Sequence, residues 1–539
     1  MPHLHFFLTF GQNKAPPMPR PKTILLWFVF LSLMTAGRVQ AQYFSKDYSL
    51  YAGTNAYISS IQVVNDTIYA MCYVGDSLNN AIGIACFEKF DKHGNLFGWN
   101  PLSIPNCPSV TSFYNSLIKS NDGGFTYVGN TWDTILNQNA FLILKFDRYG
   151  NLQWYKELPI DNVYSLYSGA LIQDSFSNYY FTGNVSPLDG TQGIYAYIAK
   201  TDSLGNMIYI KYFRNTDSFM TIEMYGLCFI KNGNIVISGG YGYFNTIDLI
   251  PDWSVSLNYE IDTAGNIIKQ VYGTDSNGRG GGYITPTSDS GYICVGNYYC
   301  TRYVDHINGA GSISKLDSNF HVIWTISAGP CSLNTILWTF RPSPDGNYIA
   351  VGQWYDENDT PQIHMNGWIM KFDENGQVIW SKLYRGVTSD GPNGDNNLFY
   401  SLAFMSDSSI LCAGQAANED DPIQPSQLGW LLHLDTAGCL PDSNNCGIAD
   451  GIKNVPQTNG SVKAYPNPAS DHLTIEYTSD GSASTLTLYN ILGQQMYSGS
   501  LPGGSGLETV NIRSWSPGLY LYRVSSPQGF EASGTFVVQ

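Results

Sequence analysis

The sequence predicts an all-β protein, a seven-bladed β-propeller of four-stranded blades followed by a small Ig-like β-sandwich. Three observations carry this prediction. The pattern apolar-Asp-x-x-Gly-Asn-apolar recurs every 55 to 62 residues, which indicates a repeat architecture. A glycine ends the expected second strand of each repeat. The chain is rich in Tyr (38), Trp (12) and Gly (54) with only 13% charged residues, as is typical of short strands joined by tight turns. The seven aspartates are Asp91, Asp147, Asp202, Asp262, Asp317, Asp373 and Asp435, and the seven glycines are Gly75, Gly129, Gly183, Gly239, Gly296, Gly352 and Gly414.

The first 41 residues read as a secretory signal peptide. Arg20 and Lys22 precede the apolar stretch 23–34, and Val39-Gln40-Ala41 offers a small-residue cleavage site. Met18 lies just before the basic pair, so we expect it to be the true start. The apolar stretch is too short to span a membrane comfortably, and no other run approaches 18 residues. We therefore expect no transmembrane segment in the mature chain.

Each repeat is expected to contain four antiparallel strands. The Asp turn lies between two strand-like runs, such as 140–146 and 152–155. A side chain that can bond its own backbone, followed by Gly or Asn able to take a positive φ, predicts a tight hairpin there. A second pair lies upstream, where 116–119 leads through a Gly-rich turn into 125–130. Four such strands make a propeller blade.

The seventh repeat lacks its fourth strand. Residues 43–48 resemble the fourth strand at 380–384, so the N-terminal strand is predicted to complete the last blade. This closure would remove both open sheet edges of a propeller covering residues 42–440. An open β-solenoid, which does not need that strand, is the alternative.

Composition and cysteines define the expected environment. A net charge of −16 repels phosphate backbones and argues against a nucleic-acid partner. All ten cysteines follow the signal peptide, where disulfides can form. Cys439 and Cys446 are the predicted bridge, because they close a short loop containing Pro and Asn.

The C-terminal region reads as a separate small domain. A linker over 441–462 precedes alternating strands in residues 463–539, which predict the sandwich. The order of its motifs resembles the type A sorting domain of the Bacteroidetes type IX secretion system, although Glu531 and its neighbours stand where the family usually has Lys. The motif residues are Tyr465, Pro466, Asn467, Pro468, Gly493, Pro517, Gly518 and Tyr520.

This resemblance implies a route and partners. The domain would be recognised by the type IX secretion machinery after export through the periplasm. It would then be removed by a sortase-like peptidase, leaving the protein anchored at the outer-membrane surface or released.

No catalytic motif is present. The chain has no H-E-x-x-H, no G-x-S-x-G and no phosphate-binding loop. Most Asp turns carry one acid each, so we expect hairpins and no metal or cofactor, with Ca²⁺ as the alternative. The acidic runs 356–359 and 419–421 are expected to be solvated loops.

One polar ring is a candidate ligand surface. The residue after each repeat glycine is mostly polar, and aromatic residues such as Trp132, Tyr241 and Trp354 lie nearby. If the blades superpose, these polar residues share one face: Asp76, Asn130, Asn184, Asn297, Gln353 and Gln415. Turn residues that satisfy backbone groups are the alternative.

The sequence thus favours a secreted or surface-anchored, non-enzymatic module that binds glycan or protein. An extracellular polysaccharide hydrolase or lyase, and a structural or adhesive surface protein, remain the alternatives.

Overall fold

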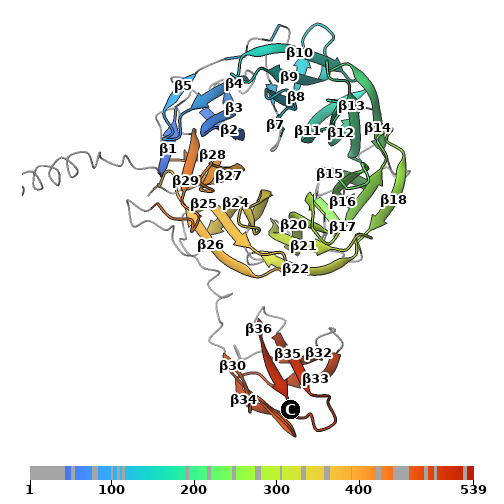
Figure 1. The fold of residues 1–539 in the computed structure, drawn as a ribbon, viewed down its shortest axis with the longest axis vertical. Coiled ribbons are helices and arrows are strands. Elements are labelled where there is room, and N and C mark those ends of the chain that lie inside the picture. Colours follow the sequence, from blue (N-terminus) through green and yellow to red (C-terminus); the bar gives the residue numbers. More distant parts are fainter. Residues whose placement is uncertain are drawn as a thin grey trace, which may run out of the picture. The chain divides into compact units, whose positions relative to one another are not determined.

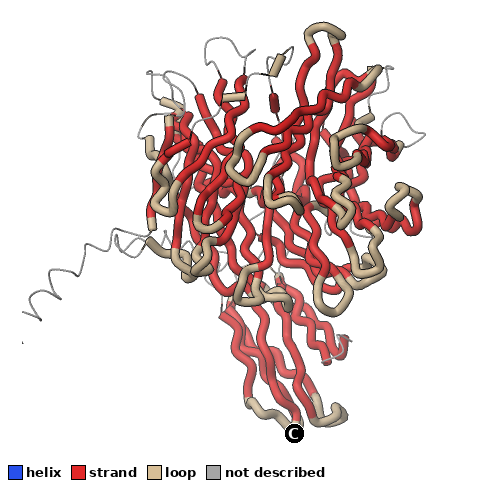
Figure 2. Tube along the Cα trace, turned by 45° about the horizontal axis from the view of Figure 1, so that its top comes forward, coloured by secondary structure: helices blue, strands red, loops and turns tan. Residues whose placement is uncertain are grey.

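The computed structural model is made of strands and loops in its described part (Figure 2). The described residues are 43–49, 55–75, 83–98, 101–102, 104–105, 110–111, 116–188, 193–214, 220–245, 250–273, 281–303, 306–328, 335–356, 364–389, 391, 393–420, 427–440, 461–478, 483–490, 495–525 and 531–539. The predicted signal peptide and the predicted linker lie outside these ranges, apart from residues 461 and 462. No described helix is long and apolar enough to cross a membrane.

Residues 43–440 form antiparallel groups of strands, most with four members. The first contains β2 (Asn55–Val64), β3 (Thr67–Gly75), β4 (Gly83–Phe90) and β5 (Leu96–Gly98). The second contains β6 (Val110–Thr111), β7 (Leu117–Lys119), β8 (Phe125–Asp133), β9 (Gln138–Phe146) and β10 (Leu152–Pro159). The third contains β11 (Val163–Gln173), β12 (Tyr179–Pro187), β13 (Tyr195–Thr201) and β14 (Met207–Phe213).

The remaining groups repeat this order. They are β15 (Met220–Phe229), β16 (Ile235–Asn245), β17 (Ile250–Ile261) and β18 (Ile267–Tyr272), then β19 (Tyr283–Pro286), β20 (Tyr292–Tyr303), β21 (His306–Leu316) and β22 (Val322–Ala328). Next come β23 (Ile336–Pro342), β24 (Tyr348–Asp356), β25 (His364–Phe372) and β26 (Val378–Tyr384). The last group contains β27 (Asp395–Phe404), β28 (Ile410–Asn418), β29 (Gln427–Leu434) and β1 (Phe44–Tyr48). A short parallel pairing of β25 with β27 joins the last two groups.

These groups follow one another around a ring, with β2, β7, β11, β15 and β27 toward its centre (Figure 1). Buried apolar clusters fill the seams between neighbouring groups. The expectation of a propeller-type, all-β fold is therefore confirmed.

The N-terminal strand closes the ring, as the sequence predicts. β1 pairs antiparallel with β29 along its whole length, from Phe44 opposite His433 to Tyr48 opposite Gly429. Trp430 Nε1 also donates a hydrogen bond to Ser45 Oγ, at 3.0 Å. β1 thus supplies the fourth strand of the last group, and the outer edge of β29 is covered.

At several seams, a lysine on the outer strand of one group donates a hydrogen bond to the Asp turn of the next group. Lys211 Nζ lies 3.1 Å from Asn266 Oδ1, and Lys269 Nζ lies 2.6 Å from Asn319 Oδ1. Lys46 on β1 makes the same reach, to Asn95 Oδ1 at 2.9 Å and to the carbonyl of His93 at 2.8 Å. The N-terminal strand therefore reproduces the contact of an ordinary outer strand.

The Asp turns are hairpin turns, as expected. In the turn at Asp147, Oδ1 accepts the amides of Tyr149 and Asn151, and Oδ2 accepts Asn151 Nδ2 at 2.9 Å. Gly150 has φ +82°, the left-handed region that glycine tolerates. At Asp262 the backbone and side-chain hydrogen bonds from Asn266 hold the pKa of the carboxyl below its usual value.

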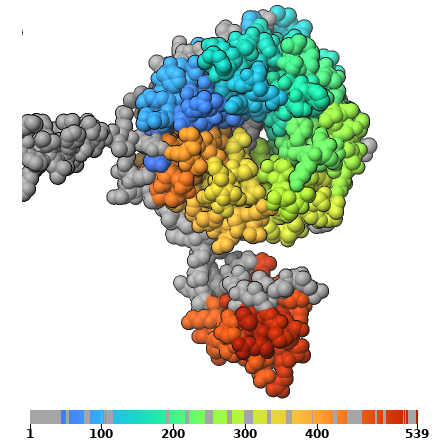
Figure 3. Space-filling model, viewed as in Figure 1, coloured from blue at the N-terminus to red at the C-terminus, as the bar shows by residue number. Residues whose placement is uncertain are grey.

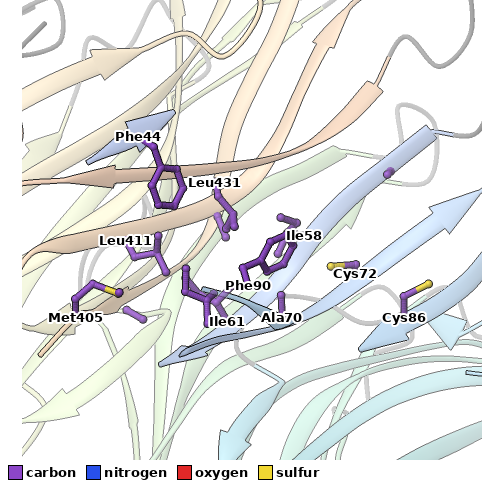
Figure 4. Packing of buried hydrophobic residues seen from close by; sticks show 14 of the residues in the cluster. Phe44, Ile58, Ile61, Ala70, Cys72, Cys86, Phe90, Met405, Leu411 and Leu431 are labelled. Carbon is purple, nitrogen blue, oxygen red and sulfur yellow. The ribbon is translucent and has the colours of Figure 1, made fainter. Parts of the chain in front are cut away.

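The seam between the first and last groups is an apolar cluster (Figure 4). Phe44, Ile58 and Leu431 are among its buried side chains. A buried acid, Glu88, lies beside Cys72 of this cluster. Glu88, on β4, is 0% exposed, and Cys72 Sγ lies 3.7 Å from its Oε2. Its Oε1 has no hydrogen-bond partner among the described residues. Burial raises the pKa of Glu88 to about 8, with a smaller opposing effect of the Cys72 hydrogen bond.

The C-terminal domain is a small sandwich, again as predicted. One sheet contains β30 (Ser461–Tyr465), β31 (His472–Thr478) and β34 (Ser505–Asn511). The other contains β32 (Ser484–Asn490), β33 (Gln495–Leu501), β35 (Gly518–Ser525) and β36 (Glu531–Val538). Buried residues of both sheets, such as Leu473, Ile475, Leu488 and Phe536, form one core.

The cysteine prediction is tested at one of its two members. Cys439 is disulfide-bonded, whereas Cys446 lies outside the described residues. The described free cysteines are Cys72, Cys86, Cys228, Cys294 and Cys412, all of them buried.

Replacement of Phe44 should destabilise the ring of strands, because it removes a buried phenyl group from the seam between the first and last groups. Phe44 is 8% exposed. We expect Phe44→Ala to lower the free energy of unfolding of the ring by about 3 kcal/mol, measured by urea denaturation of the exported chain. Phe97→Ala is the matched control, because Phe97 is 60% exposed and should matter by less than about 0.5 kcal/mol. Equal losses in the two variants would contradict closure by β1.

The pKa of Glu88 makes stability dependent on pH. Because the folded-state pKa, about 8, exceeds the unfolded value of about 4.3, the folded state holds the proton longer. The contribution of protonated Glu88 to the free energy of unfolding is fully present below pH ~4.3. It is lost as the pH rises to about 8, and the loss amounts to up to about 5 kcal/mol.

Glu88→Gln should flatten this profile, so that the variant becomes more stable than the parent at pH 9. Denaturation midpoints between pH 4 and pH 9 measure it. Glu476→Gln, at an exposed position of the sandwich, is the control and should leave the profile unchanged. A profile for Glu88→Gln that follows the parent would rule out the buried acid as its source.

Candidate functional site

The innermost strands carry a bulge at a recurring position. Their register shifts by one residue between Leu337 and Thr339 in β23 and between Phe399 and Ser401 in β27, and β15 has the same shift at Tyr225. An extra residue is inserted at each point, and a bulge of this kind re-aims the inserted side chain. The inserted residues are Trp338, Tyr400 and Tyr225, all of them partly exposed.

The repeat glycines face these bulges, which explains why they are glycines. A Cβ added to Gly352 would lie 1.9 Å from the carbonyl oxygen of Ile336, and one added to Gly414 would lie 1.9 Å from that of Leu398. The corresponding distance from Gly239 is 1.8 Å, to the carbonyl oxygen of Glu223. No side chain fits so close to a backbone, and only glycine allows this approach.

The first group departs from this alignment. Its bulge lies between Ile58 and Ser60, opposite Cys72 and Met71. Cys72 therefore occupies the place of the repeat glycine, and the alignment that used Gly75 is three residues too far along. Tyr73 follows the bulge-facing residue in this group, and Asp76 lies outside the described residues.

Three members of the predicted polar ring hold neighbouring groups together. Asn130 Oδ1 accepts the backbone amide of Ser168 at 3.0 Å, and Asn184 Oδ1 accepts that of Met224 at 2.8 Å. Asn297 Oδ1 accepts the amide of Leu337 at 3.0 Å. Each acceptor reaches the inner strand of the next group at the residue opposite that group's glycine. These asparagines connect the sheets, whatever else their amides contact.

The two predicted glutamines lie beside aromatic side chains. Gln353 Oε1 accepts Trp338 Nε1 at 3.1 Å, and Gln415 Oε1 accepts the hydroxyl of Tyr400 at 2.8 Å. Gln427 Nε2 also donates to Gln415 Oε1, at 3.0 Å. Among the described residues, neither Gln353 nor Gln415 donates a hydrogen bond through its own Nε2.

These aromatic side chains form a continuous run across three neighbouring groups. The ring centroids of Trp338 and Tyr400 are 6.3 Å apart, and those of Tyr400 and Tyr57 are 5.7 Å apart. Tyr57 stacks on Tyr73 at 5.0 Å with an interplanar angle of 26°. All four are partly exposed. We call Trp338, Tyr400, Tyr57 and Tyr73 the aromatic run; sequence reasoning missed it, although an aromatic followed by Ser or Thr marks two of its bulges.

The aromatic residues predicted near the ring lie differently. Trp132 is 40% exposed on β8. Tyr241 packs on Tyr272, and Trp354 packs edge-on against Trp368. These side chains do not join the aromatic run through any described contact.

The acidic run at Glu419 organises a loop. Asp420 accepts the hydroxyl of Ser389 at 2.6 Å and the backbone amides of Asn393 and Gly394 at 2.9 Å each. The Ser389 hydrogen bond is the main cause that holds the pKa of Asp420 below its usual value. Glu419 is exposed, so the described part of this run lies at the surface, and Asp420 holds the loop around Ser389 and Gly394.

A buried His–Asp pair lies at the junction of β25 and β27. His364 Nδ1 is 2.8 Å from Asp395 Oδ2, and that oxygen also accepts the amide of Ser389 at 3.1 Å. His364 is 4% and Asp395 1% exposed. The pair fixes the parallel bridge between the last two groups. The described residues contain no cluster of three His, Cys, Asp or Glu side chains that could hold a metal ion.

The sorting-motif residues stabilise the C-terminal sandwich. Asn467 Oδ1 accepts the backbone amide of Val537 at 2.9 Å, and the hydroxyl of Tyr520 donates to the carbonyl of Ser516 at 2.9 Å. The Tyr465-Pro466 and Asn467-Pro468 peptide bonds are both cis. Gly518 begins β35 just after Pro517, and Gly493 lies outside the described residues.

The comparison with protein families identifies this domain. The family model described as the secretion system C-terminal sorting domain matches residues 463–539. The chain therefore carries a type IX sorting domain, which directs secretion across the outer membrane to the cell surface or the medium. No curated protein matches the chain.

Solved structures with a similar chain trace include three that align with about three quarters of this chain. An α-L-arabinanase of Penicillium chrysogenum aligns with 74% of this chain and 95% of its own at 11% identity and a TM-score of 0.37. The polysaccharide lyase Uly1 aligns with 74% and 93% at 9% identity and 0.40. A Dyadobacter fermentans protein of unknown function aligns with 72% and 98% at 10% identity and 0.39. Similarity at this level says nothing of activity.

The asparagine bridges predict a stability effect. Asn184→Ala would leave the buried amide of Met224 without its acceptor, and we expect it to lower the free energy of unfolding by about 1–3 kcal/mol. Asn184→Asp keeps an acceptor oxygen at this position and should lose less. Urea denaturation of both variants measures the difference. If Asn184→Ala unfolds like the parent, the bridge does not hold the two sheets together.

Proposed function

We propose that residues 42–440 are a seven-bladed propeller that binds a glycan at the centre of its ring without catalysing a reaction. Residues 441–462 then serve as the linker, and residues 463–539 as the export domain. That domain would be recognised by the secretion machinery and removed by its sortase-like peptidase.

The aromatic run carries this proposal. Flat aromatic faces pack on the apolar C–H faces of sugar rings, and amide groups hydrogen-bond sugar hydroxyls. Trp338 and Tyr400 are oriented by Gln353 and Gln415, whose Nε2 groups donate no hydrogen bond within the described residues. The four partly exposed aromatic rings lie one after another across three neighbouring groups, and the side-chain amides of Gln353 and Gln415 lie beside them. This arrangement fits an extended oligosaccharide. In the space-filling view the centre of the ring is hollowed (Figure 3).

The distribution of acids favours binding over glycoside hydrolysis. Hydrolysis uses two carboxyl groups about 5–9.5 Å apart. The described innermost strands carry two acidic residues, Glu223 on β15 and Asp395 on β27, and these strands lie on opposite sides of the ring (Figure 1). Asp395 is also bonded to His364. The described inner wall therefore presents aromatic rings and amide groups, which suit binding, and its two acidic residues are not paired as hydrolysis requires.

Loss of an aromatic face should weaken glycan binding. We expect a glycan array probed with the exported chain to give a selective signal, and Trp338→Ala or Tyr400→Ala to reduce affinity for that glycan at least tenfold (about 1.4 kcal/mol). Trp132→Ala is the matched control, because Trp132 lies outside the aromatic run, and it should bind as the parent does.

Chemical denaturation should accompany these assays, so that unfolded variants are not counted. A blank array, or Trp338→Ala binding with parental affinity, would argue against a glycan site at the aromatic run. Product release from a bound oligosaccharide would instead support the enzymatic alternative.

A further inference from the structure

The inner wall of the ring contains a partly buried cation, Arg341, for which the described structure offers no acidic partner. The described innermost strands β2, β7, β11, β15, β19, β23 and β27 carry few charged side chains. Lys119 is exposed at the end of β7, and Asp395 is bonded to His364. This leaves Glu223 on β15 and Arg341 on β23. No salt bridge joins either residue to another described side chain.

Arg341 is held in place by a backbone carbonyl. Its Nε donates to the carbonyl oxygen of Leu402, on β27, at 2.9 Å, and the side chain is only partly exposed. Within the described residues this is its one hydrogen bond, so the two terminal nitrogens Nη1 and Nη2 have no acceptor. Burial lowers the pKa of Arg341, but a guanidinium remains charged at neutral pH.

A desolvated cation without a counter-ion is unfavourable, and an anion supplied by a ligand would relieve it. The Nη1–Nη2 edge of a guanidinium matches the two oxygens of a carboxylate or a sulfate ester in a bidentate pair. Because the bond from Nε to Leu402 fixes the guanidinium beforehand, little further ordering is needed when such an anion binds.

Arg341 and the aromatic run meet the same neighbouring strand. Trp338 contacts Tyr400 of β27, and Arg341 bonds Leu402 two residues further along β27. On β23 the two residues are three positions apart, or about 10 Å along a strand. An oligosaccharide stacked on Trp338 could therefore place a charged substituent near Arg341.

Glu223 does not neutralise this site. It lies on β15, on the opposite side of the ring from β27 (Figure 1). The hydroxyl of Tyr225 donates a hydrogen bond to its carboxyl, and burial raises its pKa. The β23–β27 seam thus keeps its positive charge in a protein whose net charge is −16.

We propose that the seam between β23 and β27 is an anion subsite, and that the glycan bound by the ring is acidic, with a carboxylate or sulfate ester paired to Arg341. This inference rests on the proposed glycan-binding function and specifies the class of glycan.

The test compares oligosaccharides that differ only in charge. Titration calorimetry of the exported chain would use oligogalacturonate, its methyl ester, a neutral galactan and a sulfated galactan. We expect the charged forms to bind at least tenfold more tightly than their neutral counterparts. The more tightly bound of the two acids identifies the anion.

Arg341→Gln should abolish the preference for charged forms while neutral forms bind as they do to the parent. Arg341→Lys keeps the charge but loses the bidentate geometry, so an intermediate preference is expected even if the Gln variant is unstable. Arg148→Gln removes the same charge from an exposed turn and should keep the full preference.

The outcomes separate the two proposals. If the parent binds the acid and its ester equally, or if Arg341→Gln keeps the preference, the anion subsite is wrong and glycan binding stands. If the parent binds no oligosaccharide of any kind, the proposed function fails and the subsite fails with it.

Discussion

The structure depends on the pairing of β1 with β29, because this pairing makes the repeats a closed body. Without it, β29 would present an open edge and the seam behind it would lose Phe44. The contact is an ordinary repeat contact made by a distant part of the chain. Lys46 clasps the turn at Asn95 as Lys211 clasps the turn at Asn266. Closure also fixes where the innermost strands lie, since every group of strands then packs against a neighbouring group on each side.

The bulge is the second constraint, and it links the fold to the candidate site. An innermost strand with regular pairing would send its side chains alternately into the two adjoining seams. The inserted residue interrupts this alternation, so that Trp338 and Tyr400 are partly exposed although the residues on either side of each are buried. The bulged backbone comes so close to the next strand that Gly352 cannot carry a side chain. The regular spacing of the repeat glycines in the sequence therefore indicates where the bulges lie, and with them Trp338 and Tyr400 of the aromatic run.

The sequence predicted what depends on local pattern and missed what depends on register. The Asp turns, the closing strand and the sandwich follow from short motifs whose partners are nearby or repeated. The alignment failed at Gly75, because the first group has Cys72 in the glycine's place and only strand pairing shows this. The sequence predicts a polar ring, but it does not show the role of Asn184, since the backbone amide whose hydrogen bond Asn184 accepts belongs to Met224, forty positions away.

The charge of the protein and the charge of its inner wall act at different ranges. A net charge of −16 repels an acidic polymer, but this repulsion is screened beyond about 8 Å at physiological ionic strength. Arg341 acts at contact distance in a partly buried seam, where screening is weak. Salt should therefore ease the approach of an acidic glycan more than it weakens the pair with Arg341. A surface patch of lysines would behave in the opposite way and lose affinity steeply with salt. The dependence of affinity on ionic strength thus distinguishes a single partly buried cation from general surface charge.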